Sequence, residues 1–265
     1  MKKKQEVIYY TDELQDEFST TQITPRKIDA SYDYGTKSFK WKLFHIFWYS
    51  IVFRPICRFT FKFILGHKIV NRKILKPYKN KPFFMYGNHT NTACDPFIPS
   101  MLAYRNHVFV IVHPNNVSMP VLGRINPYLG AIPLPDDLSA AKNFMNAIKV
   151  RIEQKRIVMI YPEAHIWPYY TKIRPFVETS FRYPVQYNVP VFCFTNTYQK
   201  RRFSSKPRIV TYVDGPFFAD GNLSSKEQKK DLRDKVYNTM TEKSKNNTVE
   251  VIKYIKKETT NKEEI

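Results

Sequence analysis

Six short apolar runs between residues 82 and 213 are the feature that most constrains the fold. Each run is rich in β-branched and aromatic residues and is bounded by polar residues, which is typical of strands buried in a sheet. The runs are PFFMY (82–86), HVFVIV (107–112), GAIPL (130–134), IVMIY (157–161), VPVFCFT (189–195) and RIVTYV (208–213).

Helical patterns accompany these runs. Residues 138–156 place their apolar side chains on one helical face, at Leu138, Ala141, Phe144, Ile148 and Ile152. Ser224 with Glu227, and Ser225 with Gln228, both fit a capping box, so a C-terminal helix is expected from about Lys226. Its packed stripe is expected to be Leu232, Val236 and Met240. The pattern predicts an α/β protein in which helices flank a single-domain, mixed and mainly parallel central sheet.

Composition limits the classes of partner. The chain has 43 Lys and Arg against 23 Asp and Glu, so its surface attracts polyanions such as anionic lipid, nucleic acid or an acidic carrier protein. Its three cysteines, Cys57, Cys94 and Cys193, are too few and too far apart for a disulfide framework or a zinc site. This cysteine usage predicts a reducing, cytoplasmic location, and no metal is expected. The basic N-terminus is not followed by the apolar stretch of a signal peptide, so secretion is not expected.

A nearly continuous apolar and aromatic segment covers residues 43–65. A membrane-spanning helix needs about 20 apolar residues, and the three cations Arg54, Arg58 and Lys62 disfavour a span. Their spacing of four predicts one cationic stripe on an amphipathic helix that lies in the lipid headgroup layer. A buried helix with snorkelling cations is the alternative interpretation.

The chain is therefore expected to have four regions. They are a polar, loosely ordered N-terminal arm (1–40), an amphipathic membrane-interfacial helical segment (41–70), the main α/β domain with its C-terminal helix (71–258) and a frayed tail (259–265).

The stretch YGNHTNTACDPF (86–97) contains a histidine and an aspartate six positions apart. Asp95 followed by Pro96 predicts a helix start, with Asp95 at the N-cap, so His89 is expected in the loop between a strand and a helix. In open α/β sheets the ends of such strands carry the chemistry. A histidine that acts as a base needs a carboxylate to orient it, and Asp95 can serve if the loop curls back.

These residues resemble motifs of the glycerolipid acyltransferase family, which includes the lysophosphatidic acid acyltransferases. NHTNTACD is similar to the motif N-H-x-x-x-x-D, although five residues instead of four separate His89 from Asp95. Tyr161-Pro162-Glu163-Ala164 resembles the motif F-P-E-G. GRINPYLGAIPLPDD (123–137) and Val189-Pro190-Val191 lie where the family carries its second motif and a further strand, so the resemblance covers roughly residues 80–215.

The resemblance implies specific roles. His89 would be the general base and Asp95 its orienting carboxylate, and Glu163 would position the acceptor or brace its own turn. The arginines with which the family contacts the acceptor phosphate have no match, so Lys172, Arg174 or Arg124 are candidates to replace them, against the alternative of solvated cations. The full set of expected substrate-binding residues is Asn88, Thr90, Arg124, Glu163, Ala164, His165, Lys172 and Arg174.

The implied reaction is acyl transfer from a coenzyme A or acyl carrier protein thioester to a hydroxyl of a glycerol phosphate, lysophospholipid or other polyol phosphate. The donor would be a co-substrate, and no further cofactor is expected. The expected partners are anionic membrane lipids at the cytoplasmic face of a membrane, where the protein would be peripheral or monotopic. Three alternatives stay open: an inactive lipid-binding member of the same fold, a thiol acyltransferase using Cys94, and a basic nucleic-acid-binding protein.

Overall fold

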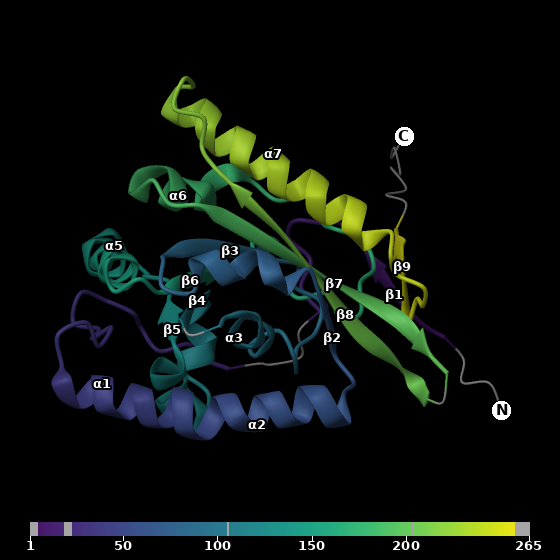
Figure 1. Cartoon of the computed structure of the whole chain (residues 1–265), viewed down its shortest axis with the longest axis horizontal. Helices are drawn as coiled ribbons and strands as arrows, with labels where there is room; N and C mark the ends of the chain where they lie inside the picture. Colours follow the sequence, from purple (N-terminus) through teal and green to yellow (C-terminus); the bar gives the residue numbers. More distant parts are fainter. Residues whose placement is uncertain (1–4, 19–22, 105, 203, 258–265) are drawn as a thin grey trace, which may run out of the picture.

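The structure, a computed structural model, describes residues 5–18, 23–104, 106–202 and 204–257, without the side chain of Ser205. Its centre is a seven-stranded sheet with the strand order β2-β8-β7-β3-β6-β4-β5 (Figure 1). All neighbouring strands are parallel except β7 and β8, which form an antiparallel hairpin. The strands are β2 (Lys68–Val70), β3 (Phe83–Gly87), β4 (Val108–Val112), β5 (Ala131–Pro133), β6 (Ile157–Ile160), β7 (Val191–Arg201) and β8 (Ser204–Phe217).

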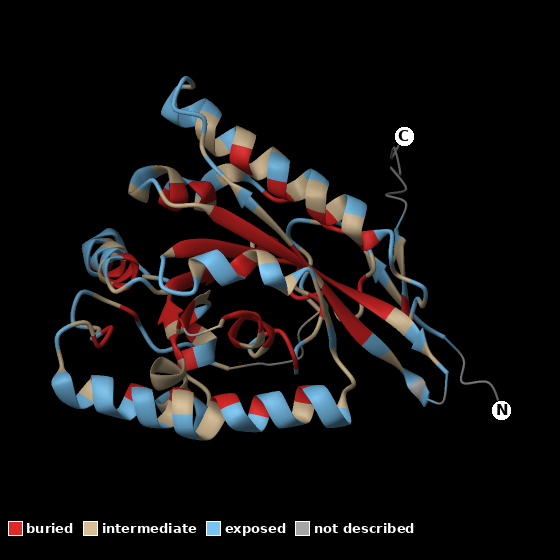
Figure 2. Ribbon diagram, in the orientation of Figure 1, coloured by how far each residue is buried: buried red, intermediate tan, exposed pale blue. Residues whose placement is uncertain are grey.

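Helices cover both faces of this sheet, and the central strand β3 shows how. Phe84 and Tyr86 belong to a core that includes side chains of α5 (Leu138–Glu153), α6 (Arg182–Tyr187) and α7 (Ser225–Ser244). Phe83 and Met85 point to the other face, into a core shared with α2 (Arg54–Phe59) and α3 (Ile98–Leu102). A strand that is buried on both faces reads as a continuous apolar run, and the red central strands in Figure 2 show this burial.

The predicted mixed, mainly parallel sheet with flanking helices is confirmed. The C-terminal helix is confirmed as well: Ser224 caps α7, Glu227 completes the capping box, and the predicted stripe of Leu232, Val236 and Met240 is buried. The sheet is larger than predicted. Strand β2 falls inside the segment assigned to the interfacial helix, and β7 and β8 extend well beyond their apolar runs. The remaining short helices are η3 (Arg72–Tyr78), η4 (Pro114–Val117), α4 (Leu122–Ile125), η5 (Asn126–Leu129) and η6 (Glu178–Phe181).

The described part of the N-terminal arm packs against the domain, which differs from the loose arm we expected. Strand β1 (Glu6–Tyr10) pairs in parallel with β9 (Ile252–Lys256) to form a separate two-stranded sheet. Farther along, Ile28 is fully buried, and its backbone N–H donates to the Asp136 carboxylate at 2.5 Å. The predicted frayed tail, 259–265, lies outside the described residues.

One long helical segment runs along the edge of the molecule (Figure 1). It consists of α1 (Phe39–His45), the π-helical η1 (Ile46–Phe53), α2 and the π-helical η2 (Thr60–Ile64). No helix among the described residues has both the length and the apolar character needed to cross a bilayer.

The expected cationic stripe on this segment is wrong at Arg54. Its guanidinium is buried and donates to the carbonyl oxygens of Ala103 (2.7 Å) and Tyr104 (2.6 Å) at the end of α3. Arg58 and Lys62 are exposed as expected. A spacing of four drifts by about 40° per step around a helix, which carries the stripe from the inner face at Arg54 toward solvent.

Candidate active site

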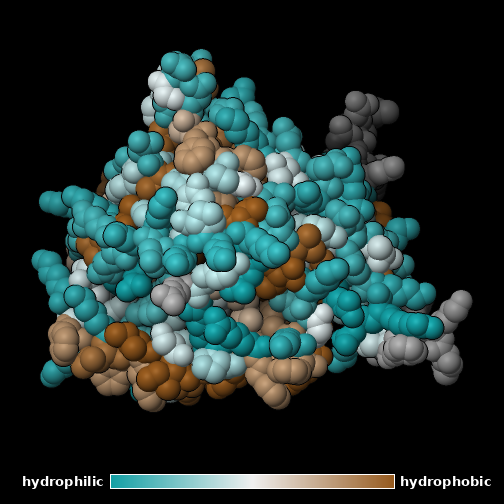
Figure 3. Space-filling view, in the orientation of Figure 1, coloured by the Kyte–Doolittle hydropathy of each residue, from teal (hydrophilic) through white to brown (hydrophobic). Residues whose placement is uncertain are grey.

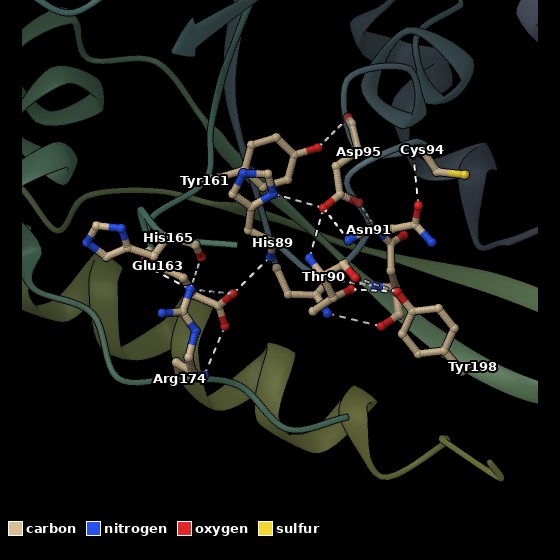
Figure 4. A network of polar contacts seen from close by, with 12 residues as sticks. His89, Thr90, Asn91, Cys94, Asp95, Tyr161, Glu163, His165, Arg174 and Tyr198 are labelled. Atoms are coloured by element: carbon tan, nitrogen blue, oxygen red, sulfur yellow. Dashed lines mark hydrogen bonds and ion pairs between the residues drawn. The ribbon is translucent and has the colours of Figure 1, made fainter. Parts of the chain in front are cut away.

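His89 lies in the loop that follows β3, where its ring meets the carboxylate of Asp95. The distance from His89 Nδ1 to Asp95 Oδ2 is 2.9 Å (Figure 4). The same oxygen accepts the backbone N–H groups of Thr90 and Asn91, each at 2.8 Å. The loop therefore curls around the carboxylate, as catalysis by this pair would require.

This arrangement corrects the predicted helix start. Asp95 is not an N-cap, because its carboxylate is already engaged by His89 and by the two preceding backbone N–H groups. The helix α3 begins three residues later, at Ile98, with Phe97 as its N-cap residue. Residues 92–97, between the His89 loop and α3, form turns.

The contacts of His89 define its tautomer. A carboxylate only accepts, so Nδ1 carries the proton and Nε2 is left with a free lone pair. The Tyr161 ring stacks on the imidazole, with 4.4 Å between centroids and 18° between planes. The Tyr161 hydroxyl donates to the backbone carbonyl of Asp95 at 2.5 Å. Tyr161 thus touches both members of the pair, and about a quarter of the His89 side chain, 23%, remains exposed.

A buried polar scaffold on β7 supports Asp95, and this part of the site was missed by the sequence analysis. The Asn196 side chain donates to Asp95 Oδ1 at 3.3 Å. The Asn88 side chain in turn bonds the backbone of Asn196 in both directions, at 2.7 and 3.0 Å. The Tyr198 hydroxyl hydrogen-bonds the side-chain hydroxyl of Thr90 and lies within donating distance of the Thr90 backbone carbonyl. The available signal was that Asn196 directly follows the apolar run VPVFCFT (189–195).

These contacts change the roles expected for two residues. Asn88 and Thr90 were predicted to bind substrate, but their side chains are buried at 1% and 0% exposure. They hold the His89 loop against β7 instead. Because both side chains are buried, neither is open to a ligand in this structure.

Glu163 braces the loop after β6. Its carboxylate accepts the backbone N–H of His89 at 2.8 Å and that of Arg174 at 2.9 Å. The Arg174 guanidinium lies 3.8 Å from the same carboxylate and donates to the backbone oxygens of Glu163 and His165. Burial raises the pKa of the Glu163 carboxyl, whereas Arg174 and the two N–H groups act in the opposite direction.

The prediction that Arg174 binds the acceptor phosphate is therefore wrong for the structure described. Its side chain is buried, at 1% exposure for the residue, and is the cationic partner of Glu163. A buried carboxylate needs such a partner, because an unpaired buried charge is strongly destabilising. Of the two roles expected for Glu163, bracing its own turn is the one that its contacts describe.

The other predicted residues are more open. Ala164 is exposed and has a positive φ of 60°, a conformation that favours glycine. His165 is partly exposed and its ring lies 3.5 Å from the Glu17 carboxylate. Lys172 is exposed on the same loop. Arg124 is separate, because it lies on α4 and lines a surface cavity whose described lining does not include His89.

Both chain termini support the loop of residues 163–174. Trp167 is fully buried, stacks on Tyr254 of β9 and donates its indole N–H to the carbonyl of Asp16. On its other side the loop bonds the His89 loop, through Trp167 N–H to His89 O (3.2 Å) and Tyr169 N–H to Thr90 O (2.8 Å). The loop of residues 163–174 is thus a packed structural element.

Cys94 does not take part in this network as a nucleophile. Burial, together with the neighbouring Asp95 charge, raises the pKa of its thiol to about 11, so the thiol stays protonated at neutral pH. Its sulfur points away from the His89 ring in Figure 4. Among the described residues, no cluster of His, Cys, Asp and Glu could hold a metal ion.

Comparisons with known proteins indicate an α/β enzyme of the acyltransferase class. Residues 67–195 match the family model described as Acyltransferase. The matched range is slightly less than half of the chain. The structure resembles the crystal structure of the 1-acyl-sn-glycerophosphate (LPA) acyltransferase PlsC from Thermotoga maritima, with a TM-score of 0.54 and 15% sequence identity. The match covers 74% of this chain and 80% of that one. No curated protein gave a significant match.

Proposed function

We propose that the protein transfers a fatty acyl group from a thioester of coenzyme A or acyl carrier protein to a hydroxyl of a glycerol phosphate or lysophospholipid. The observation that carries this proposal is the His89–Asp95 pair, in which Nδ1 is held by the carboxylate and Nε2 is left free to accept a proton. The net charge of +20 suits donors that are themselves polyanions. No other cofactor enters the proposed reaction.

In the proposed mechanism His89 acts as the general base. Nε2 takes the proton of the acceptor hydroxyl while that oxygen attacks the thioester carbonyl carbon. The imidazolium that forms is stabilised by Asp95, which already accepts from Nδ1 at 2.9 Å. When the tetrahedral intermediate collapses, the C–S bond breaks, and the sulfur takes the proton from the His89 imidazolium and leaves as a thiol. Asn196 and Tyr161 hold Asp95 in place throughout.

Lys172 is the residue that we propose for the acceptor phosphate. It is exposed on the loop that bonds the His89 loop, whereas Arg174 is buried and paired with Glu163. Partly exposed His165 lies on the same loop and can donate a hydrogen bond to the acceptor. Arg124 lines a different cavity, so we assign it no part in the reaction.

We further propose that the protein works as a peripheral or monotopic protein at the cytoplasmic face of a membrane. The long helical segment 39–64 exposes large apolar side chains along its outer side, seen as the brown lower edge in Figure 3. A contiguous apolar surface of this kind is typical of an interfacial helix, whose apolar face enters the lipid headgroup boundary. The exposed residues are Phe39, Leu43, Phe44, Ile46, Phe47, Ile51, Ile56, Phe59, Phe63 and Ile64.

The decisive experiment is an acyl-transfer assay of purified protein in detergent. Coenzyme A and acyl carrier protein donors would be offered to a panel of lyso-lipids and polyol phosphates. His89→Ala should lower turnover by a factor of about 10³ or more, and Asp95→Asn should lower it less. His113→Ala is the matched control, because His113 is exposed at the end of β4. Near-wild-type turnover of His89→Ala would remove the central claim.

A second measurement addresses the acceptor. Lys172→Gln should raise the acceptor KM far more than the donor KM, while Lys226→Gln on α7 should change neither. An unchanged acceptor KM would show that the phosphate is held elsewhere. Lipid binding without transfer from any donor would instead support an inactive lipid-binding protein.

A further inference from the structure

The tip of the β7–β8 hairpin carries a concentration of positive charge that the proposed reaction does not use. We define the hairpin tip as residues 200–202 and 206–208. Lys200, Lys206 and Arg208 are exposed there, and none of them forms an ion pair with a carboxylate in the described part of the chain. The sequence contains no Asp or Glu between residues 179 and 213, so the charge of this hairpin is not locally balanced.

The sheet register fixes where this tip lies. Lys68 pairs with Val210 in parallel, so the residues before Val210 extend in the direction of the residues before Lys68. Those residues are the end of the apolar helical segment 39–64. Ser204 is six positions before Val210, and at about 3.3 Å per residue the tip projects roughly 20 Å beyond this pairing. Figure 1 shows the tip beside the end of the helical segment.

A direct contact joins the hairpin to the helical segment. The Arg201 guanidinium donates to the carbonyl of Leu65, which caps η2, at 3.5 Å. It also lies over Gly66, where an added Cβ would meet it at 3.2 Å. A cation at a helix C-terminus is favourable, because the unpaired carbonyl groups there carry partial negative charge. The tip is thus held at a defined position next to the apolar surface.

The helical segment next to the hairpin tip is also positively charged. No Asp or Glu occurs between residues 34 and 94, and the exposed Arg58, Lys62 and Lys68 lie near its end. Apolar side chains flanked by unpaired cations match a bilayer whose surface carries phosphate groups, since the cations meet the headgroups while the apolar groups enter below them. Nucleic acid shares the phosphate chemistry but offers nothing to the adjoining apolar surface.

We propose that the hairpin tip is a second membrane contact, which binds the phosphates of anionic lipids while the helical segment enters the headgroup boundary. This inference rests on the proposed membrane association. A single helix in the interface lets the domain rotate about the helix axis. A second contact at the hairpin tip would prevent this rotation and fix the orientation of the domain on the membrane. The hairpin contact is electrostatic, so it depends on anionic lipid and on salt.

The test is vesicle binding by the full-length triple variant Lys200→Gln/Lys206→Gln/Arg208→Gln. Each cation near an anionic surface contributes about fivefold to binding, so the triple variant should bind phosphatidylglycerol-containing vesicles up to about 100-fold more weakly. Its binding to pure phosphatidylcholine vesicles should be unchanged. The matched control is Lys226→Gln/Lys229→Gln/Lys230→Gln. It removes the same charge from α7, which lies on the face of the sheet opposite to the helical segment.

A second measurement does not depend on the variant's stability. Ser204→Cys, labelled with a fluorophore, should be quenched by lipids that carry a spin label on the headgroup, whereas labelled Asn222→Cys before α7 should not. The native cysteines are buried and interfere little. Equal vesicle binding by the two triple variants, or no quenching at position 204 in vesicle-bound protein, would overturn the proposal. So would tighter binding to RNA than to anionic vesicles at the same salt concentration.

These outcomes separate the hairpin from the proposed function. If wild-type protein transfers acyl groups and binds vesicles but the hairpin variants behave as their controls, only the hairpin contact is refuted. If wild-type protein binds no vesicles, both the hairpin contact and the membrane association are refuted, whatever the transfer assay shows.

Discussion

Two interacting histidines, the buried His45 at the end of α1 and the half-buried His107 before β4, should make the protein less stable below neutral pH. His45 Nδ1 lies 2.7 Å from the carbonyl of Tyr128, and His45 Nε2 lies 2.7 Å from His107 Nδ1. His107 Nε2 in turn meets the Ser50 hydroxyl at 3.1 Å. The carbonyl only accepts, so His45 Nδ1 carries a proton. If both imidazoles are neutral, His45 Nε2 accepts from His107 Nδ1, and His107 Nε2 accepts from the Ser50 hydroxyl.

The surroundings of this pair oppose protonation. Burial, assisted by the nearby Arg151 and Arg156, lowers the pKa of His45 to about 4, although the hydrogen bond to the Tyr128 carbonyl acts in the opposite direction. Burial also lowers the pKa of His107 to about 3, assisted by His45, Arg156 and Arg54. In the unfolded chain both imidazoles titrate near their ordinary value of about 6.5. Above that pH both states are neutral and the pair has no effect on the pH dependence of stability.

Below about pH 6.5 the unfolded state binds protons that the folded state does not, so stability falls as the pH falls. The loss continues until the pH reaches the folded pKa values of about 4 and about 3. At about 1.4 kcal/mol per pH unit, each histidine should cost roughly 2 kcal/mol of unfolding free energy at pH 5 relative to pH 8. For two histidines the upper value is about 4 kcal/mol.

Urea unfolding at pH 8 and pH 5 measures this loss. In His45→Gln/His107→Gln the buried groups no longer titrate, so the loss of stability between the two pH values should shrink by roughly 2 to 4 kcal/mol. His113→Gln controls for the loss of an exposed histidine. If wild type and the double variant lose the same stability between pH 8 and pH 5, the neutral assignment of the pair is refuted.

Three further substitutions test the site. Arg174→Gln leaves the buried carboxylate of Glu163 without its cation and should lower the unfolding free energy by about 3 to 5 kcal/mol, measured by urea unfolding; an unaltered stability would contradict the buried pair. Tyr161→Phe removes the hydrogen bond to the Asp95 carbonyl and should lower kcat several-fold with little change in KM; a selective rise in KM would argue for substrate contact instead. Cys94→Ser should leave turnover nearly unchanged, and a hydroxylamine-sensitive acyl label on wild-type protein would show that the thiol does act.

Much of the fold follows from local sequence signals. Continuous apolar runs such as PFFMY form the central strands, because a strand that lies between two layers of helices buries the side chains on both of its faces. The capping box at Ser224 and Glu227 specifies where α7 begins without help from the rest of the fold. The pairing of His89 with Asp95 was predictable from the two residue types and a loop long enough to curl back.

The roles that were not predicted belong to residues whose contacts join segments that are far apart in the sequence. Arg174 looks like an exposed loop cation in the sequence, and only the buried Glu163 makes it a structural residue. Asn196 supports Asp95 from a strand that lies next to β3 only after the sheet has formed. Arg54 was misassigned because the helix phase relative to the domain depends on which side chains pack beneath it.

The parallel pairing of β1 with β9 sets an order of events during synthesis. Glu6 pairs with Ile252, so nearly the whole chain separates the two partners. The loop between them is therefore long, and the β1–β9 pair can form only after β9 has been synthesised. The apolar helical segment leaves the ribosome long before β9 and is available to a membrane while the rest of the domain is still being made. Tyr254 of β9 stacks on Trp167, and Trp167 holds the loop that carries Glu163. A nascent chain that has already reached its membrane would therefore lack a fully braced site until β9 is released.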